Sequence, residues 1–356
     1  MTNYTKAKRP LTGKSVLVTG GTGSLGRAVV RRLLAGEMGK PSKIIVFSRD
    51  EGKHHQMKLD FKHQLVGTDD IFYHNFEELL DFRVGDVRDH HAVLRVLREA
   101  DLVIHAAALK QVPSCEYFPN EAVLTNIVGA QNIVAGLREN DTPVRMAIAI
   151  STDKACKPIN VMGMTKAIQE RIFVEANLGN SRTRFSCVRY GNVVASRGSV
   201  VPLFAEQIRA GGPVTITIPE MTRFLITLDG AVDTVFAAIR QAQPGDTFVP
   251  RLPSATVENI ARAMIGDRKM ATKVIGIRPG EKIHEIMVSD EEAYRTEVVG
   301  DYYAIRSTLP EVARGPVKSP ALRGEYSSAD AVVGLEETKA ILRRAGYLDE
   351  STPRRR

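Results

Sequence analysis

Short apolar runs alternate with amphipathic segments along the first half of the chain. Runs rich in Val and Ile predict buried strands, whereas apolar residues spaced by three or four predict helices. Strands are expected at 16–19, 43–47, 82–84, 102–105 and 146–150, and helices at 27–34, 123–137 and 162–177. The alternation over residues 14–195 predicts an α/β fold, a Rossmann-type doubly wound parallel sheet with helices on both faces.

The pattern loosens after residue 195, and an amphipathic helix is expected at 335–347. Since a chain of 356 residues is long enough for two domains, we expect a second unit after the Rossmann domain. The predicted parts are a lead-in (1–13), a cofactor-binding domain (14–195), a smaller C-terminal α/β substrate lobe (196–349) that can be interleaved with the first, and a tail (350–356).

A glycine cluster follows the first strand and opens the first helix. Gly20, Gly23 and Gly26 have the wider G-x-x-G-x-x-G spacing. Glycines let backbone N–H groups approach a phosphate closely, and a helix N-terminus favours an anion there. This strand–turn–helix context predicts dinucleotide binding. The residues expected to hold the cofactor here are Gly20, Thr22, Gly23, Ser24, Leu25 and Gly26.

The choice of cofactor is expected to depend on Ser48, Arg49 and Asp50, where the second strand ends. An acidic residue at this position binds the ribose 2′-hydroxyl of NAD, whereas a basic residue accommodates the 2′-phosphate of NADP. Arg49, with Lys53 nearby, favours NADP over NAD. The alternative is a surface arginine in a turn.

Later strand ends should also face the cofactor. Asp86 would accept a hydrogen bond from the adenine amino group, whereas Asp89 is better explained as a helix N-cap. His105 is more simply explained as a packed histidine than as a catalyst. Asn126 is expected to hold a water or a backbone carbonyl near the site. Further residues expected beside the cofactor are Val87, Ala106, Ala107, Ala108, Lys110, Tyr190 and Val193.

Composition narrows the possible functions. Hydrophobic residues make up 43% and charged residues 25%, as in soluble globular proteins. The apolar runs are too short to cross a bilayer, residues 1–10 lack the apolar core of a signal peptide, and the three cysteines lack metal-ligand spacing. We therefore expect a cytoplasmic protein without a metal. The net charge is +8, but the basic residues are scattered, so an anionic small substrate explains the positive charge at least as well as nucleic acid does. We expect no nucleic-acid partner.

Asp153 and Lys154 follow the fifth strand side by side. A carboxylic acid can protonate a departing hydroxyl, and an amine can remove a proton from carbon. Opposite charges shift each other's pKa, so a neutral lysine base would need burial or another cation nearby. The alternative is a surface salt bridge. Met162 and Lys166 lie one turn apart on the next helix and share a face.

Eleven segments along the chain resemble the extended short-chain dehydrogenase/reductase superfamily. More narrowly, the chain is similar to the UDP-N-acetylglucosamine 4,6-dehydratases of bacterial surface-sugar synthesis, with the inverting type favoured. The segments are TGGTGSLG (19–26), SRDE (48–51), GDVRD (85–89), HAAALKQVP (105–113), STDKA (151–155), MGMTK (162–166), RYGNV (189–193), SRGSVVPLF (196–204), MTRFLITL (221–228), RPGEKIHE (278–285) and EYSS (325–328).

The resemblance implies a redox cycle closed within one active site. Bound NADP⁺ would take hydride from sugar C4, water would leave across C5–C6, and hydride would return to C6. The product would be a UDP-4-keto-6-deoxy sugar. By analogy Asp153 is the acid at C6, Lys154 the base at C5, and Lys166 the residue that holds the nicotinamide ribose. The resemblance also implies a homo-oligomer, a dimer or a hexamer, in which the helices at 123–137 and 162–177 pair.

One position departs from the superfamily pattern. The usual motif is Tyr-x-x-x-Lys, but Met162 stands where the tyrosine is expected. A thioether does not accept a proton at neutral pH, so the base for C4 oxidation is unassigned. Our hypothesis is that Asp153, directly or through a water, takes this proton. The alternatives are a UDP-sugar 4-epimerase or reductase, and a catalytically silent NADP-binding regulator.

The resemblance also implies contacts to the UDP-sugar. Arg223 and Arg278 are expected to bind the diphosphate, because a guanidinium pairs with phosphate oxygens bidentately. A helix that begins at 199–204 is expected to cover the uracil. The full predicted set of substrate residues is Lys110, Thr152, Asn192, Val201, Arg223, Arg278, Glu281 and Glu325.

Overall fold

The computed structural model describes residues 9–64, 76, 78–139, 141–179, 182–194, 200–313 and 315–348. Most of the predicted lead-in, the predicted domain boundary at 195/196, the first residues of SRGSVVPLF and the tail from 350 lie outside the described residues.

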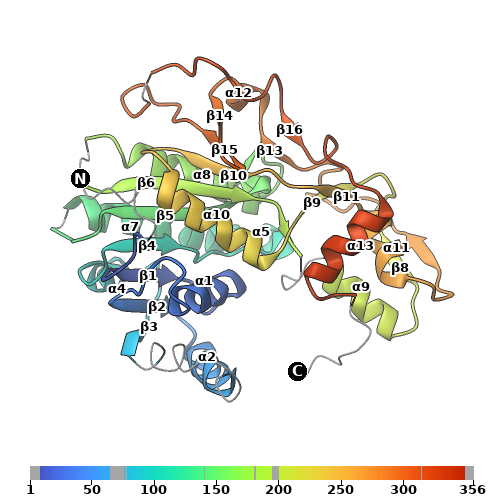
Figure 1. Cartoon of the computed structure of the whole chain (residues 1–356), viewed down its shortest axis with the longest axis horizontal. Helices are drawn as coiled ribbons and strands as arrows, with labels where there is room; N and C mark the ends of the chain where they lie inside the picture. The colour runs from blue at the N-terminus through green and yellow to red at the C-terminus, as the bar shows by residue number, and fades with distance from the viewer. Residues whose placement is uncertain are drawn as a thin grey trace.

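A nine-stranded sheet forms the centre of the molecule (Figure 1). Every neighbouring pair in it is parallel except β10–β15 and β14–β15. The predicted doubly wound α/β fold is therefore confirmed. In spatial order the strands are β14 (Thr296–Val299), β15 (Tyr302–Ile305), β10 (Thr247–Pro250), β6 (Arg184–Tyr190), β5 (Met146–Thr152), β4 (Leu102–His105), β1 (Ser15–Thr19), β2 (Lys43–Ser48) and β3 (Leu80–Val84).

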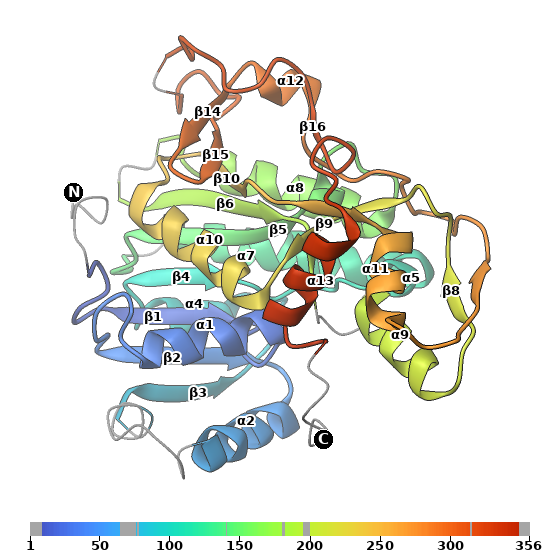
Figure 2. The same ribbon diagram turned by 45° about the vertical axis from the view of Figure 1, so that its right-hand side comes forward.

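Helices cover both faces of this sheet, as Figure 2 shows. On one face α1 (Ser24–Leu34) and α10 (Leu228–Gln241) share an apolar core with the strands, and on the other α4 (His90–Leu97), α7 (Gly129–Glu139) and α8 (Val161–Glu175) form a second core. The central strands are buried throughout, which explains their near-continuous apolar sequences. α2 (Glu51–Gln64) follows β2.

The predicted helix at 123–137 differs from the structure. The segment contains α6 (Pro119–Ala122), a wide π-helical turn at Val123–Val128 and then α7. Such turns are uncommon and often occur at functional sites. Here the turn contains the fully buried Asn126, whose side chain bonds both backbone groups of Leu109. α5 (Val112–Tyr117) precedes it.

A third apolar core lies in a lobe beside the carboxyl ends of the central strands (Figure 2). Strands β10, β14 and β15 return from this part of the chain to the large sheet, and the division into domains stays a prediction. The remaining elements are β7 (Asn192–Val193), α9 (Val200–Arg209), β8 (Val214–Ile216), β9 (Thr222–Ile226), β11 (Ser254–Thr256), α11 (Val257–Ile265), β12 (Thr272–Val274), β13 (Ile286–Val288), α12 (Asp290–Ala293), β16 (Tyr326–Ser327) and α13 (Leu335–Arg344).

Candidate active site

The turn between β1 and α1 has the geometry of a diphosphate cradle. Gly20 has φ +65°, and a Cβ there would lie 2.7 Å from the backbone nitrogen of Ala107. A Cβ on Gly26 would lie 2.5 Å from the Cα of Gly21. No side chain caps α1, and its first turn has no acidic residue. The free N–H groups of this helix can therefore bind an anion, and the turn fits the cofactor that its sequence predicts.

Side chains at the end of β2 form a hydrogen-bonded chain beside this turn. The Ser48 hydroxyl lies 3.0 Å from that of Thr22 and 2.7 Å from Nε2 of the buried His54. Arg49 has a side chain that is 59% exposed and lies 3.9 Å from Asp86, so its guanidinium is accessible to a ligand. Lys53 forms a 2.8 Å ion pair with Asp50.

Two predictions of structural roles near the cofactor are confirmed. Asp89 caps α4 by accepting hydrogen bonds from the N–H groups of His91 and Ala92. His105 is fully buried, its Nδ1 lies 2.8 Å from the Thr19 hydroxyl, and its ring stacks on Phe173. Burial lowers the pKa of His105 to about 3, so the ring is neutral at physiological pH.

Asp86 has a partner that its sequence context did not reveal, whereas Asn126 holds a backbone carbonyl, as its position in the sequence led us to expect. The Asp86 carboxylate accepts a 2.9 Å hydrogen bond from Nε of Arg88. Asn126 also donates a 3.0 Å hydrogen bond to the Thr165 hydroxyl on α8. Its amide thus links the loop after β4 to α8 and holds the carbonyl of Leu109.

Four side chains meet at the carboxyl end of β5, and we call them the acid–amine cluster: Asp153, Lys154, Asn192 and Glu285. Nζ of Lys154 lies 3.1 Å from Oδ1 of Asp153, 3.0 Å from Oδ1 of Asn192 and 3.3 Å from Oε1 of Glu285. Asp153 is fully buried and Glu285 is 2% exposed, while the Lys154 side chain is 20% exposed. The Asp153–Lys154 pair is therefore not a surface salt bridge.

The environment separates the proton affinities of the two carboxyl groups. Burial raises the pKa of Asp153 and outweighs the charge of Lys154, which opposes the increase, while the charge of Glu285 adds to it. Burial alone would raise the pKa of Glu285, but Lys154 and Arg223 outweigh it and hold the pKa below its usual range. Such a divergence is typical of carboxyl groups with different acid and base roles.

Two carboxylates contact Lys154 and outweigh the two effects that favour a neutral lysine, burial and the charge of Arg223. Burial alone would lower the pKa of Lys154, but Asp153 and Glu285 outweigh burial and raise it. An ammonium group has three N–H donors, and here three acceptors face it. In this structure Lys154 is thus charged, and each of its three N–H groups has an acceptor.

On α8, Lys166 and Met162 are both buried. Nζ of Lys166 donates to the Ile150 carbonyl at 2.5 Å and to Oε1 of Gln169 at 2.8 Å. Burial lowers the pKa of Lys166 to about 8. Met162 packs in a small apolar cluster with Cys115 and Ala122, so no proton acceptor replaces the missing tyrosine at that position.

A profile of the polysaccharide biosynthesis protein family matches residues 16–307. The chain belongs to this family. It is 44% identical over 300 residues to the "UDP-N-acetylglucosamine 4,6-dehydratase (inverting)" of Campylobacter jejuni, an alignment that covers 83% of this chain and 84% of that protein. The resemblance that the sequence motifs indicate is therefore confirmed.

Other proteins to which the chain is similar have other names. A Rickettsia bellii protein named "UDP-glucose 4-epimerase" is 40% identical over 348 residues, which cover 95% of this chain and 97% of that protein. The X-ray structure of Pen from Bacillus thuringiensis matches with TM-score 0.83 and 31% identity, covering 95% of this chain and 99% of that one. The fold is that of the extended short-chain dehydrogenase/reductase enzymes.

The structure brings some of the predicted substrate residues to the acid–amine cluster and places others away from it. Asn192 bonds Lys154 within the acid–amine cluster, and Thr152 contacts the cluster by donating to Oδ1 of Asp153. Arg223 is 8% exposed and its Nε lies 3.8 Å from Glu285. Its Nη1 donates to the carbonyls of Thr222 and Ile283. The structure therefore turns Arg223 toward the cluster.

Other predicted substrate residues lie on the lobe and its loops. Arg278 is exposed before the turn that contains Glu281, whose Oε2 is buried without a hydrogen-bond partner among the described residues. Val201 is buried in the lobe core. Glu325 accepts a 2.8 Å hydrogen bond from Lys157, which already pairs with Asp290.

Sequence reasoning missed a buried ionic network next to α8. Arg189, at 2% exposed, donates to Glu170 at 3.0 and 2.6 Å and to Glu292 at 2.7 and 2.9 Å. Glu170 also accepts a 2.5 Å hydrogen bond from Ser151. The network ties β5, β6, α8 and α12 together. Its signal in the sequence is an arginine that directly follows the apolar residues Cys187 and Val188.

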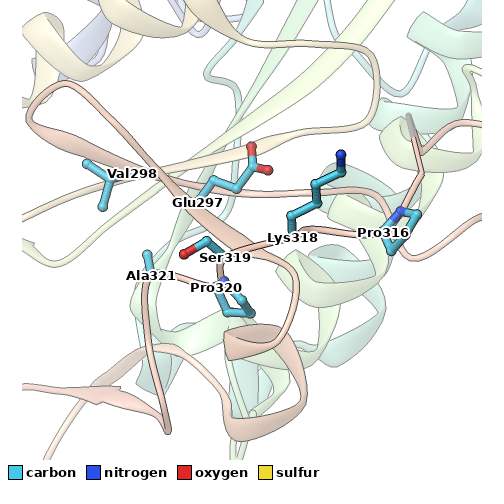
Figure 3. Close-up of a pocket in the computed structure, with 7 residues that line it drawn as sticks. All are labelled: Glu297, Val298, Pro316, Lys318, Ser319, Pro320 and Ala321. Atoms are coloured by element: carbon cyan, nitrogen blue, oxygen red, sulfur yellow. The ribbon is translucent and has the colours of Figure 1, made fainter.

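A cavity of about 650 Å³ lies away from these residues, between β14 and the segment at 316–321 (Figure 3). Its lining, which includes Glu297 and Lys318, contains none of the predicted cofactor or substrate residues. In the part of the chain that the structure describes, no group of three His, Cys, Asp or Glu is arranged to hold a metal ion, and no helix is long and apolar enough to span a membrane.

Proposed function

We propose that this protein is an NADP-dependent UDP-N-acetylglucosamine 4,6-dehydratase, a lyase that forms a UDP-4-keto-6-deoxy sugar with inversion at C5. The observation that carries the proposal is the buried Asp153–Lys154 pair, 3.1 Å apart at the carboxyl end of β5. Ligands of open α/β sheets bind at that edge. The similarity to the Campylobacter enzyme, 44% over 300 residues, supports the same reaction.

The cofactor proposal is supported by the turn after β1 and by the basic residues after β2. Gly20 and Gly26 leave room for the diphosphate, and the exposed Arg49 can pair with a 2′-phosphate. Lys166 would hold the nicotinamide ribose beside the Ile150 carbonyl that its Nζ contacts. When bound, NADP⁺ supplies the hydride acceptor for sugar C4 and then the hydride donor for C6.

Asp153 can carry one proton through the whole reaction. Its Oδ2 is buried and has no hydrogen-bond partner among the described residues, so it can accept from the sugar C4 hydroxyl, directly or through a water. The same proton then passes to the departing C6 hydroxyl, which leaves as water. The raised pKa of Asp153 suits a group that must hold a proton between these two steps.

Lys154 is the proposed base for the C5 proton, whose electron pair forms the C5–C6 double bond as water leaves. An ammonium group cannot accept a proton, so Lys154 must first lose one. The two carboxylates that surround it in the structure are the candidate acceptors.

A homo-oligomer, a dimer or a hexamer, is also part of the proposal. Exposed apolar residues support pairing through the π-helical turn and α8, where Val123 and Leu124 are each 39% exposed, Met164 is 47% and Ile168 is 46%. Size-exclusion chromatography with light scattering tests this; replacement of Met164 and Ile168 by Glu should yield monomers.

A second candidate is a UDP-sugar 4-epimerase, because the Rickettsia bellii relative with that name aligns over 95% of this chain. An epimerase also oxidises C4, but it has no use for an acid–base pair at C5 and C6. Incubation with UDP-N-acetylglucosamine followed by NMR separates the candidates. A 4-keto-6-deoxy product supports the dehydratase, a 4-epimer supports the epimerase, and unchanged substrate contradicts both.

The role of Asp153 in C4 oxidation has its own test. The Asp153→Asn variant keeps the shape of the side chain but cannot accept a proton. We expect it to lose the transient rise of reduced cofactor at 340 nm that reports C4 oxidation. A variant that oxidises C4 at the wild-type rate would remove Asp153 from this step.

A further inference from the structure

Glu285 is one of the two carboxylates of the acid–amine cluster that could accept the proton of Lys154. It directly precedes β13, is 2% exposed, and its Oε1 lies 3.3 Å from Nζ of Lys154. Its backbone is fixed from both sides, since its N–H donates to the Ser328 hydroxyl and its carbonyl accepts from the Ser328 N–H. The carboxylate is therefore held against the amine by the 285–288 and 326–328 segments.

The charges around this carboxylate come from three segments of the chain. Lys154 and Asp153 lie after β5, Arg223 on β9 is 3.8 Å from Oε1, and Lys282 lies on the preceding loop. Lys282 donates to the Cys156 carbonyl at 2.6 Å. With Asp153 and Glu285 ionised, two carboxylates face Lys154 and Arg223, so the four groups are electrically balanced.

This balance changes once Asp153 has taken the C4 proton, as the proposed dehydratase reaction requires. The Asp153 carboxyl group is then neutral because it carries the C4 proton, and the side-chain amide of Asn192 cannot accept a proton from an ammonium group. Among the described residues, Glu285 is then the remaining ionised carboxylate in contact with Nζ of Lys154.

We propose that Glu285 accepts the ammonium proton of Lys154 as that amine removes the proton from C5. The inference rests on the proposed dehydratase function. In this step the Nζ–H bond toward Glu285 breaks as an Oε1–H bond forms, and the freed nitrogen lone pair takes the C5 proton. The C5–H electron pair becomes the C5–C6 double bond, and the C6 oxygen leaves as water with the proton held by Asp153.

Every transferred proton is accounted for once C6 is reduced and C5 is reprotonated. If Lys154 returns its proton to C5, Lys154 recovers the proton stored on Glu285. If water protonates C5 from the opposite face, as inversion requires, the stored proton neutralises the hydroxide that forms. Either route restores an ionised Glu285, a charged Lys154 and an ionised Asp153.

Glu285 acts through Lys154, so it is a positioning and proton-storing residue that does not touch the sugar. The Glu285→Gln variant keeps the size of the side chain and removes its ability to accept a proton. We expect C4 oxidation, read as reduced cofactor at 340 nm, to persist with UDP-N-acetylglucosamine, and KM to change less than threefold. Product formation should fall at least 100-fold at pH 7.

The pH dependence distinguishes proton storage from other roles. In Glu285→Gln, Lys154 must lose its proton to solvent, so the residual dehydration rate should rise about tenfold per pH unit between pH 7 and 9, whereas the wild-type rate stays nearly flat. A carboxylate that merely holds Lys154 as a cation predicts the opposite, since its removal would make Lys154 a better base and speed dehydration. A purely structural role predicts a lower rate with an unchanged pH profile. Either of these outcomes overturns the proposal.

Two further variants keep the test decisive. Glu285→Asp retains the carboxylate and should recover part of the rate with the flat wild-type profile, even if Glu285→Gln folds poorly; a steep profile in Glu285→Asp contradicts the proposal. Glu336→Gln changes a side chain that is 79% exposed on α13 and should match the wild type.

Failure of the proposed function and failure of the Glu285 proposal give different results. If the wild type itself forms no 4-keto-6-deoxy product, the proposed function fails. If the wild type is active and the pH–rate profiles of wild type and Glu285→Gln are parallel, only the role of Glu285 fails.

Discussion

Replacement of Arg189 by Met should unfold the protein at much lower denaturant concentration. The substitution keeps an unbranched side chain but removes the charge shared by Glu170 and Glu292, which are 6% and 8% exposed. It also removes a 2.7 Å hydrogen bond to the Met287 carbonyl. Two buried carboxylates would lose this counter-ion, and among the described residues Glu292 would keep only Arg295, 3.8 Å away. Removal of one partner is the costly case for a buried ion pair.

The magnitude follows from the pKa of Glu292. Burial alone would raise this pKa, but Arg189 outweighs burial and lowers it from 4.5 to about 2. A decrease in the pKa of Glu292 from 4.5 to about 2 corresponds to about 3 kcal/mol of stabilisation at neutral pH. The loss of one partner from a buried ionic network costs about 3–5 kcal/mol, a range that includes this value. We therefore expect Arg189→Met to lower the free energy of unfolding by about 3–5 kcal/mol at pH 7.

The sign of the pH dependence gives a second test. The depressed pKa of Glu292 means that Arg189 stabilises the fold above pH 4.5 and that this contribution is lost as the pH falls toward about 2. In Arg189→Met the unpaired buried carboxylate is most costly when ionised. The difference between wild type and variant should therefore narrow from pH 7 to pH 5.

The chain contains no Trp, so equilibrium urea unfolding should be followed by far-ultraviolet circular dichroism. Arg182→Met is the matched control, because the Arg182–Asp141 pair has side chains that are 61% and 92% exposed; its cost should be below about 1 kcal/mol. A triple variant that also carries Glu170→Gln and Glu292→Gln should regain most of the loss. Equal costs for Arg189→Met and Arg182→Met, or a cost independent of pH, would refute this reasoning.

Three further predictions concern the cofactor side of the site. Lys166→Met should stabilise the protein by about 2 kcal/mol while abolishing activity. Burial lowers the pKa of Lys166 from 10.5 to about 8, which means that the charged lysine destabilises the fold by about 3 kcal/mol. The lost hydrogen bond to Ile150 offsets about 1 kcal/mol of the gain from its removal. This gain should be present below pH 8 and vanish by pH 10.5 in thermal unfolding; a gain that persists there contradicts it. Gly20→Ala should weaken NADPH binding at least tenfold in a fluorescence titration, whereas Gly36→Ala, at φ +74° with open space around it, should bind normally. Arg49→Ala should raise the Kd for NADPH at least tenfold and leave that for NADH unchanged, with Arg31→Ala as the control; equal effects on both cofactors would remove Arg49 from the 2′-phosphate site.

The sequence was sufficient to predict the fold because each buried strand has a local pattern of apolar residues that identifies it. Fully buried parallel strands such as Met146–Thr152 must be almost continuously apolar, and the glycine turn marks where the first of them meets its helix. The π-helical turn at Val123–Val128 escaped prediction, since the segment is apolar with helical spacing. What distinguishes it is the inward Asn126, which bonds a loop from another part of the chain.

The candidate site was predictable in part for a related reason. Asp153 and Lys154 are adjacent in sequence, so their pairing needs no knowledge of the fold. Glu285 reaches the same amine from a segment more than a hundred residues later, and only the pairing of β13 with β16 fixes where it lies. The charged residues of RPGEKIHE show no periodicity that would single out Glu285. Arg189 likewise meets its two carboxylates only through tertiary packing.

The central claim is that the amine of Lys154 removes the C5 proton of a sugar already oxidised at C4. The most direct measurement is NMR of the product formed from UDP-N-acetylglucosamine in heavy water, for the wild type and for Lys154→Met. We expect a 4-keto-6-deoxy product with deuterium at C5 from the wild type, and from Lys154→Met reduced cofactor at 340 nm but no dehydrated product. A Lys154→Met variant that forms the C5-deuterated product at the wild-type rate would contradict the account.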